Sequence, residues 1–254
     1  MKRNMLLVLA ATAVALAIPS TASLFAASPL AIPDALGFGA DATGGRGGNV
    51  QVVTNLNDSG PGSFRQAVSQ ANSIVVFDVG GVINLQSELL IASNVTVFGQ
   101  TAPGQGIALE GGSNGYNLSL SNSSNDIVQY LRVLQGGPST IKKTAVDMYG
   151  TTDALLDHVS IEYGPYDNID AVGNGSTGGD ITIQNSIIAD PVLAQTFNVH
   201  YQTGPGSFFN NILVSAHNRN PMAKANMQFV NNVIYNFQAG YTVADTSGGI
   251  VDKN

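Results

Sequence analysis

The stretch AHNRNPMAK, residues 216–224, sets two basic side chains close together in a chain that has few of them. Lysine and arginine together number 10 in 254 residues, against 17 aspartates and glutamates. Arg219 stands two residues before a proline, and Lys224 follows five residues later. A loop arginine commonly pairs with a surface carboxylate, whereas two positioned cations also offer contacts to an acidic ligand. Arg219 and Lys224 are therefore candidate site residues, and the fold must explain how they are placed.

The composition argues against several other functions. The chain contains no cysteine and three histidines, so neither a cysteine-based zinc site nor an H-E-x-x-H helix can be built. The formal net charge is −7, and the sequence has no basic patch of the kind that binds nucleic acid.

The first residues have the pattern of a secretory signal peptide. Two basic residues precede an apolar run over residues 5–18, and small residues follow. The run is too short for a comfortable membrane span, and the small residues at 22–27 suit signal cleavage. We expect a signal peptide over residues 1–26 and a single exported domain over residues 27–254, secreted or periplasmic and free of the membrane.

An internal repeat predicts the fold. Five segments share an apolar alternation, a polar pair and a second apolar alternation: DIVQYLRVL (126–134), DALLDHVSI (153–161), DITIQNSII (180–188), GSFFNNILV (206–214) and NMQFVNNVI (226–234). Two short strands joined at a polar corner form part of one coil of a parallel β-helix, in which coils stack about 4.8 Å apart. The sequence therefore predicts an all-β solenoid.

The corners and one helical segment complete the expected architecture. Asparagine tolerates a left-handed backbone and can bond to its copy in the next coil, so we expect ladders of asparagine at the corners, with His158 as a corner residue. Ser63 with Gln66 three residues later fits a capping box, and apolar residues follow at helical spacing. We expect a short helix here that covers the N-terminal end of the coil stack.

Several stretches together resemble the secreted pectate lyases. They are GFGADATGGRGGNVQVVTNLNDSGPGSFRQAV, IVVFDVGGVI, FGQTAPG, LLDHVSIEYG, and AHNRNP followed by FVNNVIYNF. The resemblance implies a right-handed parallel β-helix and calcium-assisted β-elimination of polygalacturonate. Family members usually continue well past the arginine motif, so it also implies a domain that is short at its C-terminal end.

The chemistry of that family explains the residue types it uses. The proton on C5 of a uronate is weakly acidic, because it lies beside a carboxylate whose charge opposes a second negative charge next to it. In the family, Ca²⁺ held by carboxylate oxygens offsets this charge, and the arginine of an R-x-P-x-x-R pattern removes the proton. The resemblance assigns Arg219 as this catalytic base and Lys224, in the place of the second arginine, as a substrate-binding cation.

The resemblance also implies where Ca²⁺ binds. The family pattern D-E-N-x-D appears here as YDNID, in which Asp167 and Asp170 match and Tyr166 replaces an aspartate. Thr144 stands where another ligand is usual, and Asp147 is a further oxygen donor nearby. We expect Asp167, Asp170 and Asp147 to hold Ca²⁺, with backbone, water or substrate supplying other oxygens.

A substrate-binding lysine that the family carries on the coil before the arginine is missing from TFNVHYQTGPG. His200 lies in this stretch and can hydrogen-bond a sugar. Lys143 is a candidate substitute for the missing charge, since coil stacking brings it near Asp167 and Asp170.

Two alternative functions are open from the sequence. The replaced calcium ligands favour a β-helix that binds cell-wall glycan without cleaving it. A β-helix glycoside hydrolase would need two carboxylates across the scissile bond, and Asp167 with Asp170 is the pair that could be proposed. The expected partner is an acidic plant cell-wall polysaccharide, pectate or pectin, bound by a monomer.

Overall fold

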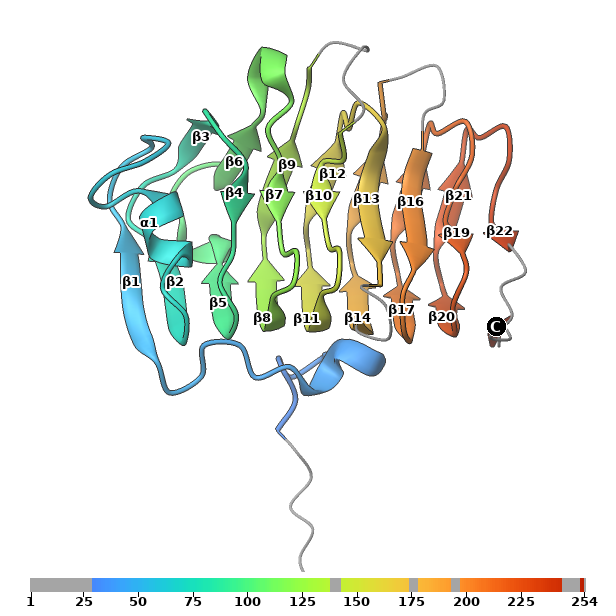
Figure 1. Cartoon of the computed structure of the whole chain (residues 1–254), viewed down its shortest axis with the longest axis horizontal. Coiled ribbons are helices and arrows are strands. Elements are labelled where there is room, and N and C mark those ends of the chain that lie inside the picture. The colour runs from blue at the N-terminus through green and yellow to red at the C-terminus, as the bar shows by residue number, and fades with distance from the viewer. Residues whose placement is uncertain (1–28, 138–142, 174–177, 193–196, 244–251, 254) are drawn as a thin grey trace, which may run out of the picture.

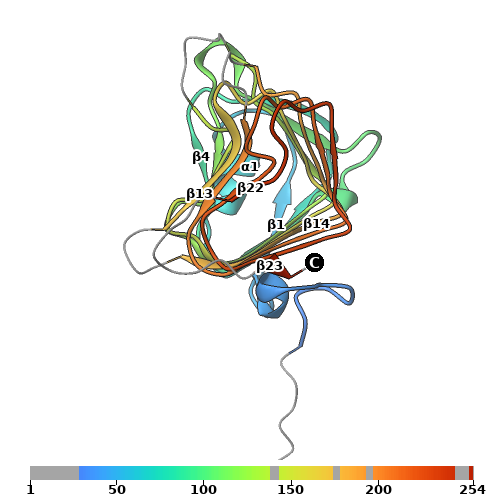
Figure 2. The ribbon, with the colours of Figure 1, turned by 90° about the vertical axis from the view of Figure 1, so that its right-hand side faces the viewer.

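The computed structural model describes residues 29–137, 143–173, 178–192, 197–243 and 252–253. The expected signal peptide at 1–26 lies outside these residues. The described chain winds into coils whose strands form three parallel sheets, called A, B and C below. Figure 1 shows the coils side by side along the long axis, and Figure 2 shows the three sheets end-on as the sides of one closed outline.

Each sheet takes one strand from successive coils. Sheet A contains β1 (Asn49–Val53), β2 (Ser73–Phe77), β5 (Val95–Phe98), β8 (Ser124–Gln129), β11 (Thr152–Asp157), β14 (Gly179–Gln184), β17 (Gly206–Phe209), β20 (Met227–Val230) and β23 (Asp252–Lys253). Sheet B contains β3 (Gly81–Asn84), β6 (Ile107–Glu110), β9 (Leu131–Leu134), β12 (Ser160–Glu162), β15 (Ile187–Ala189), β18 (Ile212–Val214) and β21 (Val233–Tyr235). Sheet C contains β4 (Leu89–Leu90), β7 (Leu118–Ser119), β10 (Val146–Asp147), β13 (Asp167–Val172), β16 (Phe197–Gln202), β19 (Met222–Ala223) and β22 (Thr242–Val243). The predicted parallel β-helix is confirmed.

The core consists of inward side chains stacked in register. Leu156 of β11 pairs with Ile183 of β14, which pairs with Phe208 of β17, and all three are buried. Alternate residues of a strand face opposite sides of a sheet, so these rows lie inside the coils while their neighbours face outwards. Each fully buried apolar side chain of this size contributes about 1.5–3 kcal/mol of transfer free energy.

The corner between sheets A and B has the predicted polar ladder. Its residues in successive coils have a left-handed backbone with φ between 52° and 57°: Tyr130, His158, Asn185, Asn210 and Asn231. The Nδ2 of Asn210 donates to Oδ1 of Asn185 at 3.3 Å, and the Nδ2 of Asn211 donates to Oδ1 of Asn232 at 2.9 Å. Asparagine is favoured here because it tolerates this backbone and because its amide pairs with the next coil.

Helix α1 (Phe64–Val68) lies at the N-terminal end of the stack, as predicted. The Ser63 side chain accepts a hydrogen bond from the Gln66 backbone N–H at 3.2 Å, and Gln66 Oε1 accepts from Gly62 at 2.8 Å. The buried side chains of Phe64, Ala67 and Val68 join the main core. The remaining short helices are η1 (Phe38–Asp41), η2 (Gly99–Thr101) and η3 (Gly112–Asn114).

The segment before β1 crosses the outer face of sheet A, where Figure 1 shows it beneath β8 to β17. Its backbone N–H groups donate to side chains that project from the sheet, including Leu36 to Gln184 and Gly39 to Thr182. A Cβ on Gly39 would lie 2.2 Å from the carbonyl oxygen of Ala154, so only glycine fits this close approach. No helix within the described ranges is long and apolar enough to span a bilayer.

Candidate active-site groove

The outer face of sheet C brings predicted site residues into one row. Asp147 pairs with Asp170, which pairs with His200, which pairs with Met222, across four successive coils. Ile169 on β13 is buried inside the coils, whereas the next residue, Asp170, faces outwards and is partly exposed. The register of the coils thus places Asp147, Asp170 and His200 beside one another, although they lie far apart in the sequence.

A groove of about 600 Å³ runs over this face and is rich in carboxylates. Its lining residues are Glu88, Tyr116, Asn117, Lys143, Thr144, Asp147, Tyr166 and Asp170. Burial raises the pKa of Asp147, and the charges of Asp170 and Glu88 raise it as well. The Ser121 hydroxyl donates to Oδ2 of Asp147 at 2.6 Å and lowers this pKa in part. Closely spaced carboxylates repel one another, and a hard cation bound between them relieves that repulsion.

Asp170 has an oxygen that its surroundings do not satisfy. Oδ1 of Asp170 is buried and has no hydrogen-bond partner among the described residues. Nδ1 of His200 lies 3.0 Å from it, which is an ion-pair distance for a protonated imidazole but lacks hydrogen-bond alignment. One ligand atom each from Asp167, Asp170 and His200 falls within 4.8 Å of the others. A buried oxygen without a donor, beside further carboxylates, fits a bound cation.

Arg219 lies at the edge of this cluster and is held on two sides. Its Nη1 donates to both carboxylate oxygens of Asp167, at 3.2 and 3.3 Å, and Asp167 is fully buried. Its Cζ lies 4.0 Å from the ring centroid of Phe197 and 5.7 Å from that of Tyr166. The pKa of Asp167 is raised to about 6, because burial and the nearby Asp170 charge raise it by more than the Arg219 charge lowers it.

The two lysines lie on the same sheet, on either side of the acidic row. Lys143 precedes β10, lines the groove, and places its Nζ 4.9 Å from the Tyr116 ring centroid. Lys224 follows β19, and its Nζ donates to Oε1 of Gln202 at 3.1 Å. His200 Nε2 lies 3.3 Å from the same Gln202 oxygen. Because β10 and β19 are three coils apart, the lysines are separated by about 14 Å along the axis.

The structure therefore brings the candidate residues together on the outer face of sheet C, although Asp167 is buried beneath this face. Asp147 and Asp170 line the groove, whereas Asp167 is buried beneath Arg219 and its oxygens face the guanidinium. Glu88 and Asn117 are groove residues that the sequence analysis missed. Each directly precedes a two-residue strand of sheet C, and strands that short leave no visible periodicity.

Comparison with known proteins agrees with this geometry. The chain is 44% identical over 222 residues to a probable pectate lyase C of Emericella nidulans and 43% identical over 222 residues to that of Aspergillus terreus, in each case covering 86% of this chain and 51% of the relative. A probable pectate lyase 6 of Arabidopsis thaliana is 30% identical over 177 residues, which cover 61% of this chain and 37% of the relative. The chain spans about half the length of the fungal relatives it matches. No protein-family model matches it.

Two solved structures share the fold. The cedar pollen allergen jun a 1 superposes with a TM-score of 0.61 at 21% identity, over 84% of this chain and 72% of its own. The thermostable pectate lyase PL 47 superposes with a TM-score of 0.59 at 14% identity, over 85% and 82%.

Fold and groove define a parallel β-helix protein with an acidic groove on the outer face of one sheet. Identity of 43–44% over most of the chain makes it similar to about half the length of fungal proteins named probable pectate lyase C.

Proposed function

We propose that this chain is a polysaccharide lyase that cleaves pectate by β-elimination, with Arg219 as the base. The observation that carries the proposal is the contact of Arg219 with Asp167, which lies in one cluster with Asp170 and His200, in a chain whose fungal relatives are named probable pectate lyases. Lyase chemistry needs a base and an environment that tolerates negative charge at the uronate, and it needs no attacking water.

The groove fits Ca²⁺ as the cofactor. Asp147 and Asp170 would hold it, with Glu88 as a third oxygen donor on the groove wall. The orphaned Oδ1 of Asp170 and the mutual repulsion of the carboxylates support this choice. When bound, Ca²⁺ would neutralise the uronate carboxylate and so increase the acidity of the adjacent C–H.

Arg219, in its neutral guanidine form, would take the proton from C5 of the uronate. The C5–H electron pair then forms a double bond between C4 and C5, the bond from C4 to the glycosidic oxygen breaks, and the leaving oxygen takes a proton from solvent. Phe197 supports the guanidinium plane, and Asp167 fixes one edge of it. An ion pair with a carboxylate favours the protonated guanidinium, so this contact has to loosen when Arg219 acts as a base. Asp167 is therefore a positioning residue in this proposal as well as a candidate metal ligand.

Lys143 and Lys224 would bind the substrate carboxylates on either side of the reacting unit. Lys143 lies in the coil of Asp147 and Lys224 one coil beyond His200, so a polyuronate lying across the strands of sheet C can contact both. His200, between them on β16, would hydrogen-bond a sugar hydroxyl or carboxylate. This placement of cations offsets the repulsion between an acidic groove and a polyanion.

We further propose that the enzyme is exported from the cell. The signal-peptide pattern at residues 1–26 supports a secreted or periplasmic location, and 27–254 would be one domain that acts as a monomer on plant cell-wall pectate or pectin.

Product analysis on polygalacturonate tests the proposal. A lyase releases an unsaturated sugar that absorbs ultraviolet light in step with new reducing ends, and we expect both signals to depend on calcium and to vanish with a chelator. Reducing ends without absorbance would indicate hydrolysis. Binding of the polymer with neither signal would indicate a β-helix that binds the glycan without cleaving it.

A further inference from the structure

Two adjoining pockets open at the corner between sheets A and B, away from the groove on sheet C. Both have Gln100, Tyr130 and His158 in their walls, so they form one continuous depression, called the corner site here. The two halves measure about 570 and 390 Å³. These volumes are in the range of small-molecule sites.

An aromatic stack separates the two halves of the corner site. The rings of Tyr130 and His158 lie 4.6 Å apart between centroids and are parallel within 11°. Both residues occupy the left-handed corner position of their coil, with φ of 52° and 54°. Tyr130 is 42% exposed and the His158 side chain 40% exposed. The two stacked rings therefore present apolar faces and polar edges to solvent.

The second face of Tyr130 is left uncovered by the preceding coil. Phe98 pairs with Gln129, so the residue beside Tyr130 is Gly99, which has no side chain. A Cβ on Gly99 would lie 2.2 Å from the carbonyl oxygen of Tyr130, so no larger residue fits there. Gly104 and Gly106 line the same half of the corner site. The sequence thus keeps the phenol ring free to meet a flat ligand.

The half beyond Tyr130 carries a positive charge. Arg132 lines it, and none of the described lining residues is a carboxylate. One Nη2 donor of Arg132 binds the Gln105 carbonyl oxygen at 3.1 Å, out of the five donors that a guanidinium has. The nearby carboxylate Glu162 does not line this half. Burial and the Asp190 charge raise the pKa of Glu162, and the Arg132 charge partly opposes this rise. In a chain of net charge −7, such a wall suits an anionic ligand.

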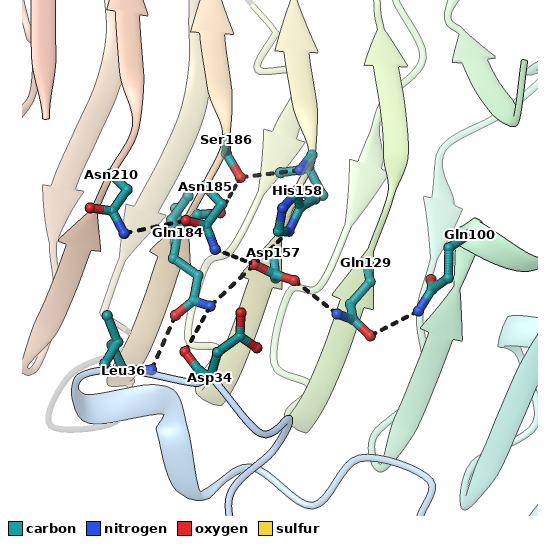
Figure 3. Close-up of polar contacts among 12 residues, drawn as sticks. Asp34, Leu36, Gln100, Gln129, Asp157, His158, Gln184, Asn185, Ser186 and Asn210 are labelled. Carbon is teal, nitrogen blue, oxygen red and sulfur yellow. Dashed lines mark hydrogen bonds and ion pairs between the residues drawn. The ribbon is translucent and has the colours of Figure 1, made fainter.

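A hydrogen-bond network around Asp157 holds His158, as Figure 3 shows. Asp157 lies 2.9 Å from Nδ1 of His158 and accepts three amide donors at 2.8 to 3.1 Å, from Gln129, Gln184 and Asn185. Burial acts to raise the pKa of Asp157, but these hydrogen bonds outweigh it and lower the pKa. The carboxylate is saturated by the protein, so it fixes the His158 ring and is not itself a ligand.

We propose that the corner site binds a uronate unit of an acidic saccharide, with the sugar ring on the free face of Tyr130 and its carboxylate on Arg132. An apolar ring face beside a fixed guanidinium matches a pyranose that carries a carboxylate, which presents C–H groups on one face and charge at its edge. This site is separate from Arg219 and would hold the polymer without cleaving it.

Histidine NMR tests the proposal directly, because His158 lies in the corner site and His200 lies on sheet C beside the groove residue Asp170. Protein labelled at histidine nitrogen is titrated with digalacturonate in the presence of a chelator. We expect a saturable shift of the His158 resonances. Affinity at His158 should fall about tenfold in Tyr130→Asn and in Arg132→Gln, while the His200 shifts stay unchanged.

Matched variants and a neutral probe make the test decisive. Asn occurs at the same corner in later coils, so Tyr130→Asn keeps a residue that accepts the left-handed backbone. Tyr163→Asn is the control, because Tyr163 has φ of 62°, is 40% exposed and lines neither half. Arg132→Gln leaves the aromatic stack intact. The neutral disaccharide galactobiose should bind about tenfold more weakly to the wild type, and Arg132→Gln should remove that difference.

Three results would overturn the corner site: an unmoved His158 resonance, equal affinity in Tyr130→Asn, or equal affinity for the neutral disaccharide. Lyase activity is measured separately, so failure here and failure of the proposed lyase function are distinguishable.

Discussion

At the scale of single residues, Arg219 is held by groups that favour its charged form. The buried Asp167 carboxylate binds one edge of the guanidinium, and the Phe197 ring covers its plane. A guanidinium carries its proton at neutral pH, and an ion pair with a carboxylate favours that charged form. For Arg219 to act as a base, its contact with Asp167 has to change. Asp167 could therefore act by positioning Arg219 or by binding Ca²⁺, and these two roles can be tested separately.

Paired substitutions separate the two roles. Asp170→Asn should raise the calcium concentration for half-maximal activity by about tenfold or more, since it removes a groove carboxylate. Asp167→Asn should lower turnover while leaving that calcium concentration within about twofold, since its oxygens face Arg219. Calcium titrations of initial rate provide both values. A tenfold calcium shift in Asp167→Asn would identify Asp167 as a ligand instead.

Lys224 should act through substrate binding. Lys224→Gln removes a cation whose distance from Arg219 is set by the fold, so KM for polygalacturonate should rise about fivefold with a smaller change in kcat. Lys224→Arg should retain most of the affinity, because the charge remains. Steady-state kinetics at fixed ionic strength measure this, and an unchanged KM in Lys224→Gln would remove Lys224 from the substrate site.

At the scale of elements, the strands of sheets A and B can be predicted from the sequence more readily than those of sheet C. Strands of sheets A and B carry the apolar alternation and the polar corners, so the repeat predicts them. β4, β7 and β10 have two residues each, and loops of varying length separate them from the preceding strands. The acidic residues on or directly before these strands were placed by resemblance or missed altogether, as Glu88 was, because register between coils is a property of the folded stack.

Strand β8 contains a buried carboxyl group that should make stability pH-dependent. Asp126 is fully buried, and its Oδ2 has no partner among the described residues, while Oδ1 accepts the Val95 N–H at 2.9 Å. Burial raises its pKa from 3.8 to about 7. The unfolded chain ionises this group near pH 4 and the folded chain only near pH 7. The free energy of unfolding should therefore fall as pH rises between these values and then level off.

The contribution of Asp126 can be measured by difference. Between pH 4 and pH 8, the wild type should lose about 2–4 kcal/mol more than Asp126→Asn, which has no charge to bury. Urea unfolding at a series of pH values gives this difference. Parallel pH profiles for the two proteins would show that Asp126 does not carry the effect.

The asparagine ladder should contribute measurably to stability. Asn211 is buried, accepts the Ser186 N–H at 2.9 Å and donates to the Ile183 carbonyl at 2.9 Å. Asn211→Ala leaves these backbone groups unpaired at a cost of about 1–3 kcal/mol each. The exposed Asn226→Ala serves as the control and should change stability by less than about 0.5 kcal/mol. Equal unfolding midpoints for the two variants would contradict the ladder's role.

At the scale of the whole molecule, stacking of coils assembles one surface from residues between 88 and 224. Composition and the repeat predicted the solenoid, the corner ladder and the N-terminal helix, since each has a periodic or capping signal. The crossing of sheet A by residues before β1 was not predicted. That segment has no periodicity, and it is held by pairs of hydrogen bonds with side chains such as Thr182 and Gln184 that lie far away in sequence.

The most direct measurement of the central claim is the initial rate of ultraviolet-absorbing product formation from polygalacturonate with saturating calcium, for wild type, Arg219→Lys and Arg219→Ala. We expect calcium-dependent product from the wild type and losses of at least about a hundredfold in both variants, since neither retains a guanidinium against Phe197 and Asp167. Circular dichroism and unfolding midpoints establish that the variants are folded. Wild-type rates in a folded Arg219→Ala, or no product from the wild type, would contradict the proposed lyase mechanism.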